Sequence, residues 1–252
     1  MQSLEIKKIN LCQLNPKVGA ITENLAKIIS AISEAKTKKV DVILFPELCL
    51  TGYPPNDILF RKSYQSQIFN AIQRIQELAH DIVVLVGHPF FSNDKIYNSA
   101  SVIAGGKVIL RHDKIMLPNR EVFDEKRYFF AGEDVKSFYI KNTKCALVIC
   151  EDIWHESVNL KIKKLKPELI FCINASPFQI GKLNQRIKII KNACSIHSAN
   201  YLYLNLVGGQ DSLVFDGSSF AIDSSGKVVA QAKQFHEDKL EINFTSKKMV
   251  GA

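Results

Sequence analysis

The chain has 252 residues, of which 46% are hydrophobic and 23% charged, and this composition predicts one large globular domain with a substantial core. Its formal net charge of +8 is spread along the sequence in pairs such as Lys38-Lys39, without an RNA-binding aromatic motif or zinc-finger spacing, so we predict no nucleic-acid partner. Residues 2–8 lack the long apolar run of a signal peptide or membrane span, which favours a cytoplasmic protein without a membrane partner.

The predicted elements alternate between helices and strands along the chain. Apolar residues at helical spacing predict a helix over 25–32, with Thr22 as its N-cap, and a second helix over 68–78. This alternation favours a layered α/β architecture. Runs that are largely apolar predict strands covered on both faces, at 40–45, 82–86, 146–149, 169–173 and 202–206.

Two hairpins are predicted beside these buried strands. Gly105-Gly106 separates strand candidates at 101–104 and 108–111, and residues 223–226 separate candidates at 219–222 and 228–230. The sheets are therefore predicted to be mixed. The last strand candidate is 240–244, and because no linker, repeat or low-complexity tract interrupts the chain, we expect residues 1–252 to form a single domain that ends just after this strand.

The six cysteines contain no Cys-x-x-Cys pair, and several lie in apolar runs, as Cys172 does. This pattern is typical of reduced, mostly buried thiols, and it predicts neither disulfides nor a metal site. Cys150 stands directly after a buried strand candidate, at a position where a thiol can take part in chemistry.

Three reactive side chains follow directly on strand-like segments. Glu47 follows residues 40–46, Lys114 follows residues 108–113, and Cys150 follows residues 145–149. The ends of neighbouring strands in an α/β sheet converge on one crevice, so a carboxylate, an ammonium and a thiol are expected to meet there. Each residue alone also has an ordinary structural interpretation, as a helix-start carboxylate, a solvated lysine or a buried thiol.

Together the three side chains suffice for attack on an unactivated carboxamide. Cys150 would be the nucleophile, and a neighbouring ammonium would favour its thiolate form. Glu47 would take the thiol proton and return it to the departing ammonia. Lys114, with a backbone N–H after Cys150, would stabilise the oxyanion, and water activated by Glu47 would hydrolyse the thioester.

The segments around these residues resemble the motifs of the nitrilase superfamily. Residues 45–55 resemble its glutamate motif, residues 114–129 its lysine motif and residues 149–154 its cysteine motif, in the same order and with similar spacing. Within the superfamily, residues 117–129, 174–182 and 205–217 look like the glutaminase domain of glutamine-dependent NAD⁺ synthetases. The resemblance implies a four-layer α-β-β-α sandwich of the nitrilase type, with the roles of the triad given above.

The same resemblance implies a pocket for glutamine. A carboxylate would face the α-ammonium of the substrate, and a hydroxyl or a cation would face its carboxylate. Glu121 is a candidate second acid that orients Lys114, with an exposed loop glutamate as the alternative. Arg120 stands where a tyrosine is common in the family, so its contact with glutamine is not predicted. The pocket candidates are Tyr53, Phe123 and Glu125 near the mouth, with Ser176 and Lys182 after the fifth motif.

The ATP-using domain of these synthetases has no counterpart in this chain. That domain carries a Ser-Gly-Gly-x-Asp-Ser phosphate loop, which residues 208–212 imitate, but Val207 replaces the serine and too few residues follow to build a nucleotide domain. We therefore expect a nitrilase-domain loop there and no cofactor in this domain. ATP and Mg²⁺ would belong to the absent synthetase domain or to a partner subunit. The resemblance also implies a homo-oligomer.

Two other functions stay open. A free-standing nitrilase-type amidase acting on a small ω-amide or an N-carbamoyl compound would share the triad and differ in its pocket and in the lack of a synthetase partner. A catalytically silent binding or scaffold domain belongs to another class, and the intact triad argues against it. A papain-like pair of Cys150 with His155 lacks the local signature of that class.

Overall fold

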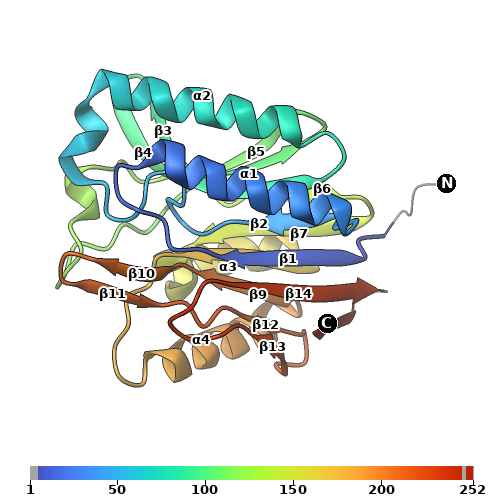
Figure 1. Ribbon diagram of the computed structural model, residues 1–252. Helices are drawn as coiled ribbons and strands as arrows, with labels where there is room; N and C mark the ends of the chain where they lie inside the picture. Colours follow the sequence, from blue (N-terminus) through green and yellow to red (C-terminus); the bar gives the residue numbers. More distant parts are fainter. Residues whose placement is uncertain (1–4, 246–247, 252) are drawn as a thin grey trace.

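Two mixed β-sheets pack face to face in the computed structural model, which describes residues 5–245 and 248–251. One sheet has seven strands in the order β15-β14-β1-β2-β3-β4-β5, the other has six in the order β13-β12-β9-β8-β7-β6, and β10 pairs with β11 alone (Figure 1). The strands are β1 (Lys8–Gln13), β2 (Val42–Leu44), β3 (Val83–Ser92), β4 (Lys95–Ala104), β5 (Lys107–Asp113), β6 (Ser137–Ile140), β7 (Thr143–Ile149), β8 (Leu169–Asn174), β9 (Asn200–Asn205), β10 (Val207–Gln210), β11 (Leu213–Asp216), β12 (Phe220–Ile222), β13 (Val228–Gln231), β14 (Asp238–Thr245) and β15 (Lys248–Gly251).

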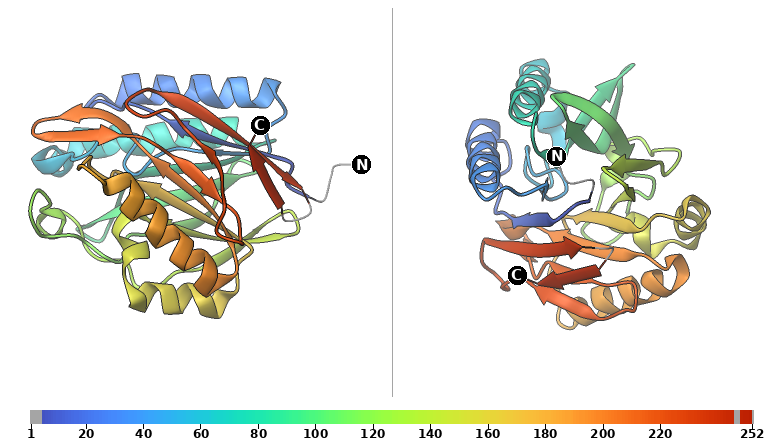
Figure 2. Two further views of the ribbon diagram at one scale, coloured as in Figure 1. Left: turned by 90° about the horizontal axis from the view of Figure 1, so that it is seen from below. Right: turned by 90° about the vertical axis from the view of Figure 1, so that its right-hand side faces the viewer.

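Four α-helices cover the outer faces of the two sheets, as the end-on view in Figure 2 shows. The pair α1 and α2 packs on the seven-stranded sheet, and the pair α3 and α4 packs on the six-stranded sheet. The helices are α1 (Ile21–Thr37), α2 (Lys62–Leu78), α3 (Glu156–Leu165) and α4 (Lys182–His197), and the 3₁₀ turns are η1 (Asn56–Phe60), η2 (Glu125–Arg127) and η3 (Cys150–Trp154).

The alternation of side chains along each strand divides the apolar residues among three cores. In β2, Ile43 packs toward α1 and α2, whereas Val42 and Leu44 pack between the sheets. In β8, Phe171 packs between the sheets and Ile170 packs toward α3 and α4. Since each sheet is apolar on both faces, the layers follow the order α-β-β-α, and the predicted four-layer sandwich is confirmed.

Both predicted helices are confirmed, but one end differs from the prediction. Thr22 lies inside the first turn of α1, and Ala20 occupies the cap position. The amide of Asn24 accepts a hydrogen bond from the backbone N–H of Lys17 and donates one to the Lys17 carbonyl, at 2.9 and 2.8 Å. This pair of bonds fixes the entering chain so that the helix begins before Thr22, and Thr22 is not its N-cap. None of the helices in the described ranges is long and apolar enough to cross a membrane.

The five buried strands and both hairpins are confirmed, and so is the mixed character of the sheets. β3 runs further than predicted, to Ser92, because Asn93 and Asp94 both adopt positive φ and turn the chain directly into β4. Residues 208–212 lie in the β10–β11 hairpin, consistent with a loop of this domain. β15 follows the predicted last strand and pairs with β14.

The strand directions bring the candidate residues to one edge of the sandwich. β1, β2 and β3 are parallel, β4 reverses and β5 reverses again, so β5 ends at the same edge as β2. In the other sheet β7, β8 and β9 are parallel. Glu47 follows β2, Lys114 follows β5 and Cys150 follows β7. The β10–β11 ribbon continues from β9 and lies at the left of Figure 1.

Candidate active site

Lys114 carries a buried ammonium group between two carboxylates. Its side chain is 1% exposed, and its Nζ donates to Glu47 Oε1 at 2.8 Å and to Glu125 Oε1 at 2.7 Å. Burial alone would lower the pKa of Lys114, but the charges of Glu125 and Glu47 raise it well above its ordinary value. The side chain is therefore a fixed cation at neutral pH, suited to stabilising negative charge rather than to accepting a proton.

Glu47 is held by three chain segments through its two carboxylate oxygens. Oε1 accepts from Lys114 Nζ and from Asn98 Nδ2 at 2.7 Å, and Oε2 accepts from the backbone N–H of Ala175 at 2.6 Å. The turn that carries Glu47 also packs closely on β3. A Cβ atom added at Gly87 would lie 2.3 Å from the Pro46 carbonyl oxygen, so this approach requires glycine.

Cys150 begins the η3 turn directly after β7, with a φ of 46° that non-glycine residues rarely adopt. Its side chain is nearly buried, at 8% exposure. Burial and then the charge of Glu47 raise its pKa well above the ordinary thiol value, while Lys114 opposes this shift. The sequence predicted a thiolate favoured by the ammonium, but the raised pKa indicates a neutral thiol, because burial disfavours the thiolate and the charges of Glu47 and Glu125 add to this effect against Lys114. Attack therefore needs a base.

Glu125 is the second acid beside Lys114. It lies in η2, is 4% exposed, and accepts from Tyr53 Oη at 2.8 Å in addition to Lys114. Burial raises its pKa to about 7, against the opposing charge of Lys114. Its Oε2 has no hydrogen-bond partner among the described residues. Glu121, the candidate named from the sequence for this role, is exposed at the surface, so its alternative interpretation as a loop glutamate is the better one.

Tyr53 and Glu125 line a cavity of about 180 Å³ together with the turn of the β10–β11 ribbon, at Gln210, Asp211 and Ser212. Two of the three residues predicted near the pocket mouth, Tyr53 and Glu125, thus line the same cavity, and Phe123 does not. Such a volume suits a small molecule rather than a polymer.

The other predicted pocket residues lie on three different segments. Phe123 is partly buried and packs on the core beneath α1 and α2. Ser176 is buried after β8, where its Oγ accepts from Arg186 Nε at 3.1 Å. Lys182 begins α4, and its Nζ lies 4.7 Å from the centre of the Trp154 ring. Arg120 is exposed and donates to Glu151 Oε1 at 3.0 Å.

The sequence reasoning missed the partners that hold the three reactive groups. Asn98 is a fully buried amide in β4, and because other polar residues such as Ser99 and Ser101 also lie in this strand, no signal in its sequence singled out Asn98. Asp152 and His112 are also buried, and the carboxylate accepts from His112 Nε2 at 2.8 Å. Among the described residues, no group of three or more His, Cys, Asp or Glu side chains is placed to hold a metal ion.

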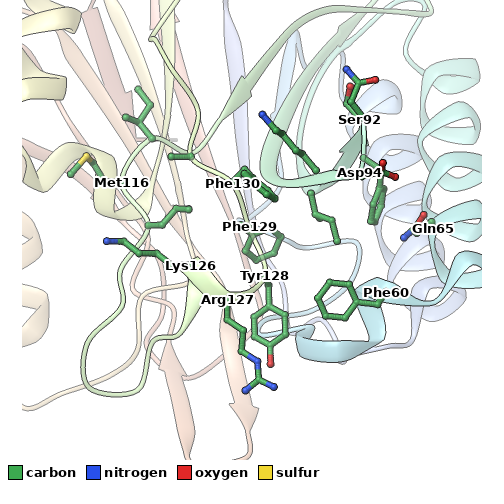
Figure 3. Close-up of a pocket in the computed structure, with 17 residues that line it drawn as sticks. Phe60, Gln65, Ser92, Asp94, Met116, Lys126, Arg127, Tyr128, Phe129 and Phe130 are labelled. Atoms are coloured by element: carbon green, nitrogen blue, oxygen red, sulfur yellow. The ribbon is translucent and has the colours of Figure 1, made fainter.

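A second cavity, of about 850 Å³, is drawn in Figure 3. Its wall mixes aromatic with polar and charged side chains, and Phe60, Tyr128, Phe129 and Phe130 all contribute to it. The wall includes residues 126–131, which continue from Glu125, but it contains no cysteine and no buried ion pair. Reactive groups gather in the cluster around Lys114, and the candidate site is therefore placed there.

The sequence profile of the family "Carbon-nitrogen hydrolase" matches residues 8–247. The curated glutamine-dependent NAD⁺ synthetase of Acinetobacter baylyi is 39% identical over 232 residues, which cover 92% of this chain and 43% of that protein. The synthetase of Aquifex aeolicus is 39% identical over 237 residues, covering 93% of this chain and 41% of that protein. The chain spans less than half the length of these curated relatives.

Solved structures agree in fold. The glutamine-dependent NAD⁺ synthetase from Acinetobacter baumannii, solved with adenosine diphosphate, matches with a TM-score of 0.94 at 35% identity, covering 98% of this chain and 48% of that one. An amidase of the nitrilase superfamily from Nesterenkonia matches with a TM-score of 0.84 at 20% identity, covering 97% of this chain and 92% of that one, a likeness of fold alone. Since the family profile spans nearly the whole sequence, the chain belongs to the carbon-nitrogen hydrolase family.

Proposed function

We propose that this domain hydrolyses the side-chain carboxamide of glutamine and releases ammonia. The observation that carries the proposal is the buried cluster in which Lys114 joins Glu47 to Glu125, with Cys150 close enough for all three charges to shift its pKa. A thiol, a carboxylate and a fixed cation supply a nucleophile, a base and an oxyanion partner. The identity of about 39% to glutamine-dependent synthetases supports glutamine as the amide.

The first half of the reaction forms a thioester. Glu47 takes the proton of the Cys150 thiol as the sulfur attacks the carboxamide carbon, and the carbonyl oxygen becomes an oxyanion beside Lys114. The protonated Glu47 then gives its proton to the nitrogen as the C–N bond breaks, so ammonia leaves and an acyl-thioester remains. Because Asn98 and Ala175 hold both oxygens of Glu47, the base stays in place through this transfer.

The second half hydrolyses the thioester. Glu47, ionised again, takes a proton from water as the oxygen attacks the acyl carbon, and a second tetrahedral intermediate forms beside Lys114. The C–S bond then breaks and the sulfur regains a proton from Glu47. One carboxamide and one water thus give one carboxylic acid and one ammonia.

The pocket proposed for glutamine uses the residues around the cluster. Tyr53, Phe123 and Glu125 would form its mouth, with Ser176 and Lys182 toward the α-carboxylate. The 180 Å³ cavity beside Tyr53 and Glu125 supports a ligand of this size. The unpartnered Oε2 of Glu125 is buried, and in the ionised carboxylate it is an acceptor that an ammonium or amide N–H can satisfy.

The ammonia would serve ATP-dependent NAD⁺ synthesis from nicotinic acid adenine dinucleotide on residues outside this chain. The support is that the curated relatives are named as synthetases and are more than twice as long as the stretch they share with it. ATP and Mg²⁺ would belong to that other part. A cytoplasmic location and a homo-oligomeric state stay predictions, and light scattering of the purified chain checks the oligomeric state.

The test is ammonia release from glutamine by the wild-type chain and by Cys150→Ala, with Cys194→Ala as the matched control. Cys194 is a buried thiol of α4 that packs in the core between α4 and the six-stranded sheet, and it is not among the groups that act on Cys150. We expect Cys150→Ala to lose release by more than about 10³-fold while keeping its fold, because the nucleophile is gone. Retained release in that variant would refute the assignment.

A panel of ω-amides and N-carbamoyl compounds belongs in the same assay. A value of kcat/KM for one of them well above that for glutamine would replace the glutaminase proposal with a free-standing amidase. Absence of turnover on every compound, together with unreactive Cys150, would leave the silent binding domain.

A further inference from the structure

Asp152 places a fully buried carboxylate between the chain segments that carry Lys114 and Cys150. Oδ1 accepts from the backbone N–H groups of Ile115 and Met116, both at 2.9 Å. Oδ2 accepts from the backbone N–H of Ile149 at 3.0 Å and from His112 Nε2 at 2.8 Å. Both oxygens are thus saturated, and these bonds stabilise the charge in the absence of solvent.

The donors come from two different sheets. His112 lies in β5, an edge strand of the seven-stranded sheet. Ile115 and Met116 directly follow Lys114 in the loop that leaves β5. Ile149 ends β7 in the six-stranded sheet and directly precedes Cys150. A single carboxylate therefore joins the two sheets within one residue of the candidate nucleophile and one residue of the candidate oxyanion partner.

Both groups need such a connection. Cys150 has positive φ, a strained conformation for a non-glycine residue that persists only where its surroundings fix it. Lys114 must hold its Nζ within hydrogen-bond distance of the oxygen that becomes negative. An error of about 1 Å between sulfur and ammonium is enough to cost about 10²-fold in rate.

We propose that Asp152, itself oriented by His112, is a positioning residue that sets the distance between the Cys150 thiol and the Lys114 ammonium across the two sheets. This proposal rests on the proposed function, because the distance between thiol and ammonium matters only if Cys150 is the nucleophile and Lys114 stabilises the oxyanion. His112 must carry its proton on Nε2 to donate to the carboxylate, and its Nδ1 has no partner among the described residues. His112 therefore contributes one hydrogen bond to Asp152, and another side chain whose N–H reaches the same carboxylate oxygen can replace it.

The variant Asp152→Asn tests the connection at constant shape. One amide oxygen can still accept from Ile115 and Met116, but the NH₂ group would face the N–H of Ile149, so the Cys150 turn loses its acceptor. We expect kcat on glutamine to fall at least 100-fold with KM within about threefold of wild type. The matched control is Asp113→Asn. Asp113 precedes Lys114 in the sequence, but its carboxylate accepts from Arg111 and Ser99 and makes no bond to the Cys150 turn, so we expect kcat of this variant to stay within threefold of wild type.

His112 supplies a rescue test. His112→Gln keeps an N–H near the former Nε2 and should retain kcat within about threefold, whereas His112→Leu removes the donor and should lose at least tenfold. A residue needed only for folding would lower soluble yield and melting temperature in both variants without separating their kcat values. Equal kcat for the two variants, or equal losses in Asp152→Asn and Asp113→Asn, would overturn the proposal.

The rate of Cys150 alkylation by iodoacetamide, followed by mass spectrometry, separates this proposal from the proposed function. It needs no knowledge of the natural amide. We expect Asp152→Asn to react at least tenfold more slowly than wild type and Asp113→Asn to react at the wild-type rate, because only the former moves the thiol from its base. If wild type turns over no amide, the glutaminase proposal fails while this difference in alkylation still supports the positioning role; an unchanged rate in Asp152→Asn would reject that role.

Discussion

Replacing Lys114 by methionine removes the cation that Glu47 and Glu125 share and keeps an unbranched side chain in its place. The two carboxylates stay buried, at 1% and 4% exposure, with Asn98 still donating to Glu47 and Tyr53 still donating to Glu125. Removing one partner of a buried ion pair costs about 3–5 kcal/mol because the remaining charge is uncompensated. We expect the free energy of unfolding of Lys114→Met to fall by that amount at pH 8.

The loss should be smaller at lower pH. Burial raises the pKa of Glu125 to about 7 while Lys114 lowers it, so removal of Lys114 raises it further. Near pH 8 the folded variant therefore keeps a proton on Glu125 that the folded wild type has already released. The unfolded chain releases the same proton near the ordinary pKa of a glutamate. Since a state that binds more protons gains stability as pH falls, the deficit of the variant shrinks from pH 8 to pH 5.

Urea unfolding followed by circular dichroism at pH 5.5 and pH 8 measures both effects. With a slope of about 3 kcal/mol per M for a chain of this size, the midpoint should move by about 1–2 M at pH 8. Adding Glu125→Gln to Lys114→Met should restore part of the loss by removing one unpaired charge. Lys188→Met, at an exposed position on α4, is the control and should change stability by less than about 0.5 kcal/mol. An unchanged midpoint at pH 8, or a double variant no more stable than the single one, would refute this reasoning.

Three further predictions concern the same cluster. The pKa of Glu125 is raised to about 7 in the folded state, so the folded chain holds a proton that the unfolded chain loses near pH 4.5, and the stability of the wild type should fall as pH rises from 4.5 to 8. Compared with Glu125→Gln, the free energy of unfolding of the wild type should fall by about 3 kcal/mol over this range. A constant difference between the two proteins in urea titrations would contradict this prediction. Gly87→Ala places a Cβ 2.3 Å from the carbonyl oxygen before Glu47, so we expect at least about 2 kcal/mol of destabilisation and a tenfold loss of kcat, whereas Gly209→Ala, with no atom nearer than 3.7 Å, should be tolerated. Asn98→Asp replaces a donor to Glu47, the proposed base, by a further carboxylate, so the acid limb of the pH–kcat/KM profile should move upward by at least about one pH unit. If the acid limb keeps its position, Asn98 does not act on Glu47.

The positions of the buried strands could be predicted because their residues are apolar on both faces. β8 is an example, since an apolar run of six residues is too short for a typical helix. The missed strands lack that signal. β10 is Val207–Gln210, half glycine, and it exists because β11 pairs with it residue by residue. β3 was cut short in the prediction because its last residues are only partly buried, and the Asn93-Asp94 turn that extends the hairpin was not recognised.

The clustering of the candidate residues was predictable where a side chain follows a strand directly and not where it depends on an irregular segment. Glu47, Lys114 and Cys150 were named from their positions after strands together with the motifs that surround them. Between Lys114 and Glu125 the chain contains Pro118 and no regular element, so sequence spacing could not tell which acid returns to the ammonium. Glu121 is nearer in sequence, yet the 3₁₀ turn that begins at Glu125 directs the later carboxylate inward.

The protonation of Glu125 bears on how the proposed nucleophile forms. Cys150 is a neutral thiol at rest, and the charge of Glu125 adds to that of Glu47 in opposing ionisation of the sulfur. When Glu125 is protonated, the cluster holds one anion and one cation, and Glu47 can accept the thiol proton without leaving two carboxylates and a sulfur anion around one ammonium. Ionised Glu125 instead draws Lys114 toward itself and away from the developing oxyanion. In the proposed mechanism we therefore expect the protonation of Glu125 to decide whether the Lys114 ammonium is held by the protein or can contact the substrate.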